Sequence, residues 1–177
     1  VPPPPFALPP ELPFTRQALD AADALFPYSQ EHSLEQVTRL RAQGFTPDET
    51  ANILGLVKAR TRALSKFGNR ARTMFLTEHG AQQATRPVVA AEHAAVFARA
   101  GVRSVADLGC GIGADSLEFA RASLATVSVE LDPLTASFVA ANLADFSGSR
   151  VVVGDVTNFN PESFRDSTGE AVQGIWL

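Results

Sequence analysis

One stretch of the chain, with alternating glycines flanked by acids, has residue types suited to binding a ligand. Residues 105–115 read Val-Ala-Asp-Leu-Gly-Cys-Gly-Ile-Gly-Ala-Asp, with glycines at positions 109, 111 and 113. Glycine adopts positive φ easily and lets the main chain approach a ligand without an intervening Cβ. Between a strand and a helix, such a bend lies where open α/β sheets bind nucleotides. The spacing therefore predicts a bend that holds a nucleotide-type ligand.

Two classes of cofactor compete for this bend. Gly109, Gly111 and Ala114 satisfy the dinucleotide pattern G-x-G-x-x-[G/A]. An acid, Glu130, follows about 20 residues later, as NAD-binding folds require. An NAD-dependent oxidoreductase is therefore one interpretation of the stretch.

Three features favour S-adenosylmethionine as the cofactor. Asp107 stands two residues before the first glycine, where its carboxylate can attract the cationic amino group of the methionine moiety. Gly113 tightens the spacing to G-x-G-x-G. Asp155 follows a predicted strand and can accept a hydrogen bond from the adenine amino group. These features make S-adenosylmethionine the predicted cofactor.

Other residues around the bend have predicted roles of their own. Glu130 ends a second predicted strand, and its two oxygens can accept hydrogen bonds from both ribose hydroxyls. Asp132 is interpreted as the cap of a helix that begins at Pro133. Cys110 is interpreted as a small space-filler with a useful N–H group rather than a nucleophile. The cofactor-binding residues predicted on this side of the chain are Asp107, Leu108, Gly109, Cys110, Gly111, Gly113, Asp115, Glu130, Leu131, Asp155 and Val156.

Strands and helices alternate after Gly101, which places the bend in an α/β domain. Such alternation implies a mainly parallel, Rossmann-like sheet of about four strands with helices on both faces. The predicted strands are Ser104–Leu108, Thr126–Leu131, Arg150–Val153 and Gly174–Leu177. The predicted helices start near Ala114, span Pro133–Asp145, and include a short one near Pro161–Phe164.

The chain before this domain has a different pattern. Residues 1–13 contain seven prolines and are expected to be flexible or polyproline-like. Residues 14–80 form a predicted all-helical domain, and residues 81–177 the nucleotide-binding domain. Helix starts are predicted at Ser33, with Gln36 as its capping-box partner, at Thr46-Pro47-Asp48-Glu49, and after Thr85 as the cap of a helix over 86–100.

Six basic residues lie between positions 58 and 72 with no acid among them. On a helix, Lys58, Arg62 and Lys66 are four residues apart and share one face. With Arg70, these side chains could position an RNA phosphate backbone. A solvated helix face, balanced by the acidic excess of residues 11–49, explains the pattern equally well.

The chain resembles the class I methyltransferases over about residues 103–177. Asp107-x-Gly109-x-Gly111-x-Gly113 resembles the first motif of that superfamily, Glu130 its second and Asp155 its third. The resemblance implies a Rossmann-like methyltransferase sheet that binds S-adenosylmethionine. The motifs are specific for the cofactor and unspecific for the substrate.

A second resemblance covers the segment before this domain. Residues 75–87, Phe-Leu-Thr-Glu-His-Gly-Ala-Gln-Gln-Ala-Thr-Arg-Pro, resemble the linker of a bacterial methyltransferase family whose members carry a C-terminal THUMP-like domain. The segment is also similar to the trimethylguanosine synthase group, which methylates an exocyclic guanine amine in RNA. This resemblance implies that Gln83 and Thr85 lie near the methionine end of the cofactor, and that the helix starting at Pro87 faces its carboxylate.

Together the resemblances imply an RNA base-amine methyltransferase. The family's substrate-facing Asp-Pro-rich loop would follow Leu177, so no catalytic residue is predicted and the chain is expected to be a fragment. A non-catalytic module that binds S-adenosylmethionine or RNA is the alternative.

Composition narrows the class of protein further. The chain has 177 residues, a net charge of -4 and a single cysteine, so it cannot form an internal disulfide. Its hydrophobic runs are shorter than the roughly 18 residues of a membrane span. A cytoplasmic location and no membrane partner are therefore expected, and the oligomeric state is left open. The histidines, at positions 32, 79 and 93, lack ligand spacing and are expected to make ordinary polar contacts without binding metal.

Overall fold

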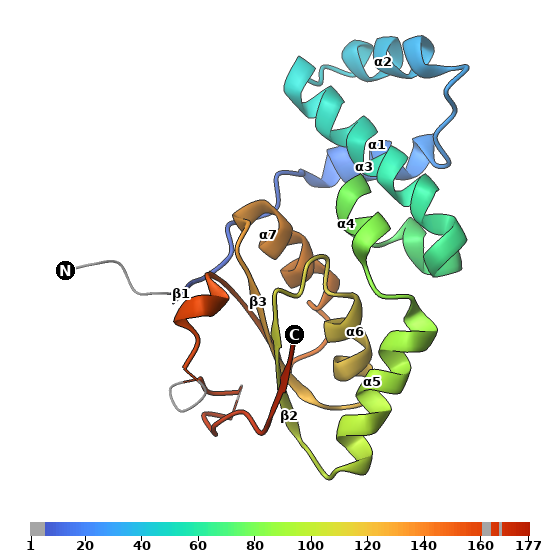
Figure 1. Ribbon diagram of the computed structural model, residues 1–177. Coiled ribbons are helices and arrows are strands. Elements are labelled where there is room, and N and C mark those ends of the chain that lie inside the picture. Colours follow the sequence, from blue (N-terminus) through green and yellow to red (C-terminus); the bar gives the residue numbers. More distant parts are fainter. Residues whose placement is uncertain (1–5, 161–163, 167) are drawn as a thin grey trace, which may run out of the picture. The chain divides into compact units, whose positions relative to one another are not determined.

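The computed structural model describes residues 6–160, 164–166 and 168–177, which fall into two compact units (Figure 1). The helical unit runs from Leu12 to Gln83. The sheet unit combines Ala84–Leu177 with the segment that precedes Leu12. The expected boundary at residue 80 therefore lies three residues before the one that the contacts define, because the helix that contains residues 81–83 packs with the helical unit.

The helical unit consists of four α-helices and one 3-10 helix. They are α1 (Arg16–Leu25), α2 (Ser33–Ala42), α3 (Pro47–Phe67), η1 (Gly68–Arg72) and α4 (Glu78–Gln83). Helix α3 begins as predicted, because the Thr46 side chain accepts a hydrogen bond from the Glu49 amide and the Glu49 side chain accepts one from the Thr46 amide. It ends at Gly68, which has a positive φ of 58°.

The start of α2 differs from the prediction. Ser33 is the first helical residue and not the cap. His32 occupies the cap position without a side-chain capping bond, and its carbonyl accepts a hydrogen bond from the Gln36 amide. The Gln36 side chain is buried and unavailable for a capping box. The burial of the Gln36 side chain therefore prevents the predicted capping box, and α2 starts without a side-chain cap.

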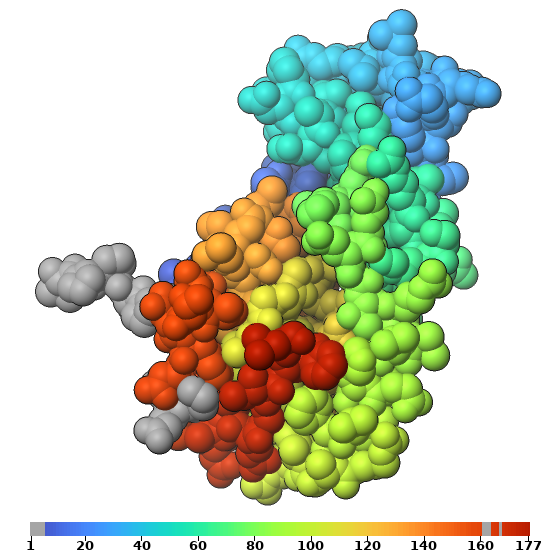
Figure 2. Space-filling model, in the orientation of Figure 1, coloured from blue at the N-terminus to red at the C-terminus, as the bar shows by residue number. Residues whose placement is uncertain are grey.

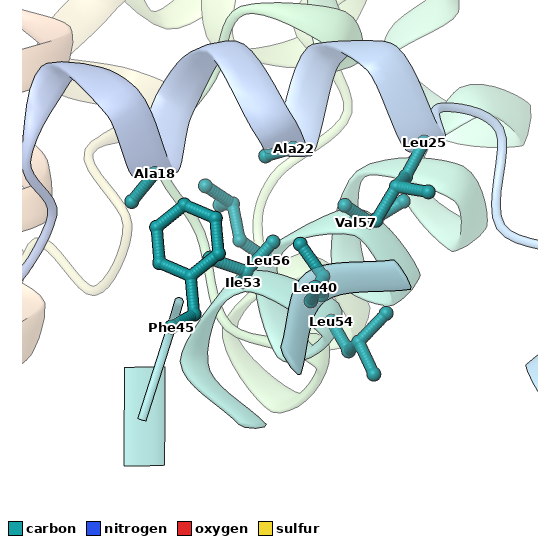
Figure 3. Close-up of a cluster of buried hydrophobic side chains, with 9 residues drawn as sticks. All are labelled: Ala18, Ala22, Leu25, Leu40, Phe45, Ile53, Leu54, Leu56 and Val57. Carbon is teal, nitrogen blue, oxygen red and sulfur yellow. The ribbon is translucent and has the colours of Figure 1, made fainter. Parts of the chain in front are cut away.

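One apolar cluster holds the helical unit together (Figure 3). Its side chains come from α1, α2, α3 and the loop before α3, and nearly all are fully buried: Ala18, Ala22, Leu25, Leu40, Phe45, Ile53, Leu54, Leu56 and Val57. Beside this core, the guanidinium of Arg60 is also buried. It donates hydrogen bonds to the Met74 carbonyl and to the Asp23 carboxylate, each at 2.9 Å. Burial lowers the pKa of Arg60, and the charge of Asp23 opposes that shift.

The sheet unit is a five-stranded sheet with the order β1-β4-β3-β2-β5. All pairs are parallel except β1 with β4. The elements are β1 (Phe6–Ala7), α5 (Pro87–Arg99), β2 (Ser104–Leu108), α6 (Ala114–Arg121), β3 (Ala125–Glu130), α7 (Pro133–Asn142), β4 (Ser149–Gly154), η2 (Val156–Asn158) and β5 (Gly174–Trp176). The predicted short helix near Pro161–Phe164 falls mostly on residues 161–163, which lie outside the described part.

Strand β1 differs from the flexible segment that the prolines led us to expect. Phe6 and Ala7 pair antiparallel with Gly154 and Val153. These two residues interrupt the prolines and can donate main-chain hydrogen bonds to an open sheet edge. The Phe6 ring also packs edge-on against Phe164, with centroids 4.7 Å apart. The sheet therefore has five strands instead of about four.

Among the described residues, the α-helices of this unit, α5, α6 and α7, all cover one face of the sheet, whereas helices on both faces were expected. Val105 of β2 packs with α5 and α6, and Val151 of β4 packs with α6 and α7. The connections from β2 to β3 and from β3 to β4 advance in the same direction, and right-handed crossovers then put both helices on the same side. The opposite face, with Ala106 and Val129, is covered by side chains of the segment after β4, which Figure 1 shows on the other side of β2 from α5 and α6.

The strand order reverses between β2 and β5. Strands β3 and β4 extend the sheet from one side of β2, and the chain then returns so that β5 pairs with its other side. Such a reversal opens a crevice at the carboxyl ends of the strands, where doubly wound sheets bind ligands. The loop after β2 and the end of β5 both lie there, and Figure 2 shows the end of β5, in dark red, at the surface beside the yellow segment that contains this loop.

Candidate cofactor site

The bend after β2 is a loop of three glycines held against the end of β3. Gly109, Gly111 and Gly113 have φ values of 74°, 55° and 77°, which favour glycine. The amides of Gly109 and Cys110 both donate to the Val129 carbonyl, at 2.9 and 3.0 Å. The loop is therefore tied to the strand that carries Glu130.

The glycines serve different purposes in the loop. A Cβ built on Gly113 would lie 2.8 Å from a methyl of Val139 in α7, so this glycine allows close packing of helix against loop. A Cβ on Gly109 or Gly111 would meet nothing within 4 Å. These two residues leave main chain open to an approaching ligand, as the sequence predicts for a nucleotide-binding bend.

Glu130 meets the loop directly. One of its carboxylate oxygens accepts a hydrogen bond from the Gly111 amide at 3.0 Å, and the other accepts one from the Asp132 amide at 2.9 Å. Each oxygen retains further acceptor capacity. The next residue, Leu131, leaves 66% of its surface exposed although it is large and apolar. An apolar side chain beside a fixed carboxylate suits a ligand that combines a flat base with a sugar.

Asp107 lies beneath the loop in a buried position. Only 3% of the residue is exposed, and its carboxylate accepts a hydrogen bond from the Ser116 hydroxyl. Burial raises the pKa of Asp107 to about 7, the Ser116 hydrogen bond opposes the shift, and the nearby charges of Asp115 and Glu130 add to it. The charges of Asp115 and Glu130 therefore lie near enough to Asp107 to affect its ionisation.

Cys110 is no nucleophile in this environment. Burial raises the pKa of its thiol well above the ordinary value, and the charges of Asp107 and Glu130 add to the shift. The shift favours the protonated thiol over the nucleophilic thiolate. This agrees with its interpretation as a small residue that fills space.

Asp115, the second residue of α6, joins a hydrogen-bonded cluster that local spacing does not reveal. The Thr85 hydroxyl donates to one carboxylate oxygen of Asp115 at 2.5 Å, and Nδ1 of His93 lies 2.7 Å from the other. The prediction that Thr85 caps α5 is wrong, because Arg86 is the cap residue and makes no side-chain capping bond. His93 was expected to make only an ordinary polar contact, and nothing in its sequence neighbourhood marks it.

Asp155, at the end of the third predicted strand, bonds to the turn that follows it and not to the glycine loop. Asp155 follows β4 at the same edge of the sheet as Glu130, because Glu130 pairs with Val153. Its carboxylate accepts hydrogen bonds from the amide and hydroxyl of Thr157, which lower its pKa and cap η2. Val156 packs into the core of the opposite sheet face, as does Leu108 at the end of β2. Asp155 is exposed at this edge of the sheet, whereas Val156 and Leu108 act as packing residues.

The predicted RNA-binding residues have partners within the helical unit. Lys58 lies over the Tyr28 ring, 4.9 Å from its centroid, and Lys66 donates to the Gln82 carbonyl at 2.6 Å. Arg62 forms an ion pair with Glu78. Arg70 lies in η1, beyond the end of α3. Gln83, expected near the methionine end of the cofactor, is the last residue of α4 in this unit.

The described residues contain neither a cluster suited to a metal ion nor a helix suited to a membrane. No group of three or more histidine, cysteine or acidic side chains is arranged to hold a metal ion there. None of the helices in that part of the chain is both long and apolar enough to cross a bilayer.

Comparison with solved structures identifies the fold. A Porphyromonas gingivalis protein assigned as a methyltransferase matches 82% of this chain with a TM-score of 0.62 and 17% identity, over 37% of its own length. A Pyrococcus horikoshii protein assigned as an RNA methyltransferase matches 46% of this chain with a TM-score of 0.41 and 30% identity, over 41% of its length. An amino pentose methyltransferase from Micromonospora echinaspora matches 47% with a TM-score of 0.39 and 27% identity, over 34% of its length.

The match with a TM-score of 0.62 defines the class of fold. The chain has the Rossmann-like α/β fold of methyltransferases, as the sequence predicts, and it spans less than half the length of each of these structures. No protein-family model matches the chain, and no curated protein does.

Proposed function

We propose that the sheet unit binds S-adenosylmethionine and that the protein is a methyltransferase. The observation that carries the proposal is the contact of the Glu130 carboxylate with a glycine loop, above the buried carboxyl of Asp107, at the switch point of a methyltransferase-like sheet. Negative charge at this loop attracts a sulfonium nucleoside with a cationic amino group. A dinucleotide would place its negatively charged pyrophosphate on the same loop, above the Asp107 carboxyl, whose ionised form would repel it.

The residues fit this cofactor part by part. The carboxylate of Glu130 faces the loop and has acceptor capacity for ribose hydroxyls, and Leu131 offers an apolar contact for a base. A cation near Asp107 would favour the ionised form of its carboxyl, whose pKa is raised by burial to about 7. The exposed carboxylate of Asp155 is the proposed acceptor for the adenine amino group.

The bound cofactor would supply an electrophilic methyl group on its sulfonium. Methyl transfer is an in-line displacement, so the protein contributes mainly by fixing the cofactor and orienting the acceptor. The loop amides and Glu130 provide the fixed part of that geometry. We assign no proton-transfer role to a residue of the described chain.

Calorimetric titration with S-adenosylmethionine and with NAD tests the cofactor. We expect binding of S-adenosylmethionine, and a loss of roughly tenfold or more in Glu130→Gln, since one charge-assisted acceptor is removed. Glu92→Gln, at an exposed position of α5, is the matched control and should bind normally. Binding of NAD without binding of S-adenosylmethionine would overturn the proposal.

We further propose RNA as the methyl acceptor, recruited by the cationic face of Lys58, Arg62 and Lys66 on α3. The Arg62 side chain remains 62% exposed although it is paired with Glu78, so phosphate can replace that carboxylate. Reversing both charges, in Arg62→Glu with Lys66→Glu, should weaken RNA binding and reduce its salt dependence. Arg16→Glu with Arg99→Glu makes the same charge change at other exposed positions. Equal RNA binding by both double variants would reject this interface.

An exocyclic base amine is the acceptor atom that we propose, on the basis of the resemblance of residues 75–87 to the trimethylguanosine synthase group. Incubation of the full-length protein with labelled cofactor and total RNA, followed by nucleoside analysis, should yield N-methylated bases. Absence of label in RNA would reject RNA as the methyl acceptor. A THUMP-like domain in the full-length protein and a cytoplasmic location stay predictions from the sequence.

A further inference from the structure

Four side chains cluster at the carboxyl ends of β2 and β5. His93 of α5 lies between Asp115, 2.7 Å from its Nδ1, and the Trp176 ring, whose centroid is 4.2 Å from that of the imidazole. Thr85 binds the second oxygen of Asp115. Trp176 is the last residue of β5 and pairs in register with Asp107 of β2. The cluster therefore borders the site proposed for the cofactor, on the side of β5.

The contacts of His93 define its chemistry. Its Nδ1 lies 2.7 Å from a carboxylate oxygen of Asp115, and a proton on Nδ1 forms a hydrogen bond that holds the ring in one orientation. Its side chain is 25% exposed and that of Asp115 is 12% exposed. No described residue forms a hydrogen bond with Nε2 of His93. When both ring nitrogens carry a proton, a ring held in this way presents Nε2–H as one oriented donor together with one positive charge.

The cofactor has a group that needs such a donor. The methionine moiety of S-adenosylmethionine carries both an ammonium and a carboxylate. Asp107 and Glu130 are suited to its cationic and hydroxyl groups and would repel the carboxylate. A carboxylate is bound well by a charged N–H donor and by the free amides at a helix N-terminus. The contact with Asp115 brings the His93 ring to the start of α6, where such amides lie.

We propose that His93, positioned by Asp115 and protonated on both ring nitrogens, donates a hydrogen bond from Nε2 to the methionine carboxylate of S-adenosylmethionine. This inference rests on the proposed function, because it assigns one part of that cofactor to one side chain. It divides the site into a nucleoside end at Glu130 and Leu131 and a carboxylate end at His93.

The test compares S-adenosylmethionine with its decarboxylated form, which keeps the sulfonium and the amine. Calorimetric titration of the wild type should show roughly tenfold to one-hundredfold weaker binding of the decarboxylated form, the usual effect of one charge-assisted hydrogen bond. His93→Asn keeps an amide donor for Asp115 and removes the Nε2 donor. It should weaken binding of S-adenosylmethionine by a similar factor and change binding of the decarboxylated form by no more than about twofold. Glu92→Gln on the same helix should affect neither ligand.

The possible outcomes separate the inference from the function on which it rests. Equal affinity of the wild type for both ligands would overturn the role of His93 and leave the cofactor assignment standing, and this measurement needs no variant. A loss in His93→Asn that is equal for both ligands would assign His93 to structure alone and also overturn the inference. If the wild type binds neither ligand, the proposed function itself fails.

Discussion

At the residue scale, the site is decided by which carboxyl groups reach the glycine loop. Glu130 accepts a hydrogen bond from the Gly111 amide, which places its carboxylate at the loop. Asp107 faces inward and binds Ser116 beneath the loop. Its influence on a ligand is therefore electrostatic, through a buried carboxyl whose pKa burial raises.

The raised pKa of Asp107 predicts a dependence of stability on pH. The folded chain keeps this proton up to about pH 7, whereas the unfolded chain loses it near the ordinary pKa of 3.8. Between these values the folded state binds more protons, so the contribution of Asp107 to the free energy of unfolding falls as pH rises. Asp107→Asn lacks this titration, and its stability relative to the wild type should increase by up to about 4 kcal/mol between pH 4 and pH 8. Urea denaturation at several pH values measures the difference, and a difference that does not change with pH would contradict the shift.

At the element scale, the loop and α7 depend on the absence of a side chain at one position. Gly113→Ala should lower the free energy of unfolding by about 2–4 kcal/mol, because it combines a positive φ with a clash against Val139. Gly101→Ala is the control with a similar φ and no neighbour within 4 Å, and it should cost only about 1 kcal/mol. Combining Gly113→Ala with Val139→Ala should cost less than the sum of the two single changes. Strict additivity of the two would argue against the contact.

Helix starts offer a second test at this scale. Thr46→Ala removes a capping box and should destabilise the helical unit by about 1 kcal/mol. Ser33→Ala should change stability by less than about 0.5 kcal/mol, since Ser33 is already inside α2 and its side chain makes no capping bond. Thermal unfolding followed by circular dichroism compares the two variants. An equal loss of stability in both variants would show that Ser33 also acts as a helix cap.

At the scale of the whole molecule, each unit has its own core, and the helical unit also depends on one buried cation. Arg60→Leu leaves the buried Met74 carbonyl without its donor, while Asp23 stays accessible to water. The loss of stability should be about 2–3 kcal/mol. Hydrogen exchange should therefore accelerate in α1 and α3, with the amides of β3 as the internal reference. Arg62→Leu, at a largely exposed position on the same helix, should have little effect. Equal exchange in the two variants would contradict the role of Arg60.

The cluster at Asp115 shows the limit of sequence patterns. Thr85 and His93 lie 30 and 22 residues from Asp115 in the chain. Capping chemistry favours Thr85 as a helix start, but packing of α5 against α6 directs its hydroxyl to a carboxylate instead. No periodicity or motif in the sequence predicts these contacts, so only the tertiary structure shows that His93 lies near Asp115.

The sequence by itself determined the strands β2, β3 and β4, the helices between them and the glycine loop, because hydrophobic period, caps and positive-φ positions are local properties. It also brought Glu130 to that loop, since parallel strands that are neighbours in the chain end at the same edge. Three features were decided by the tertiary structure alone. Helices α5, α6 and α7 pack on the same face of the sheet, Phe6 and Ala7 add a strand to its edge, and His93 contacts Asp115. Each of these depends on contacts between segments distant in sequence, whose energies are set by packing and burial and not by the residues nearby in the chain.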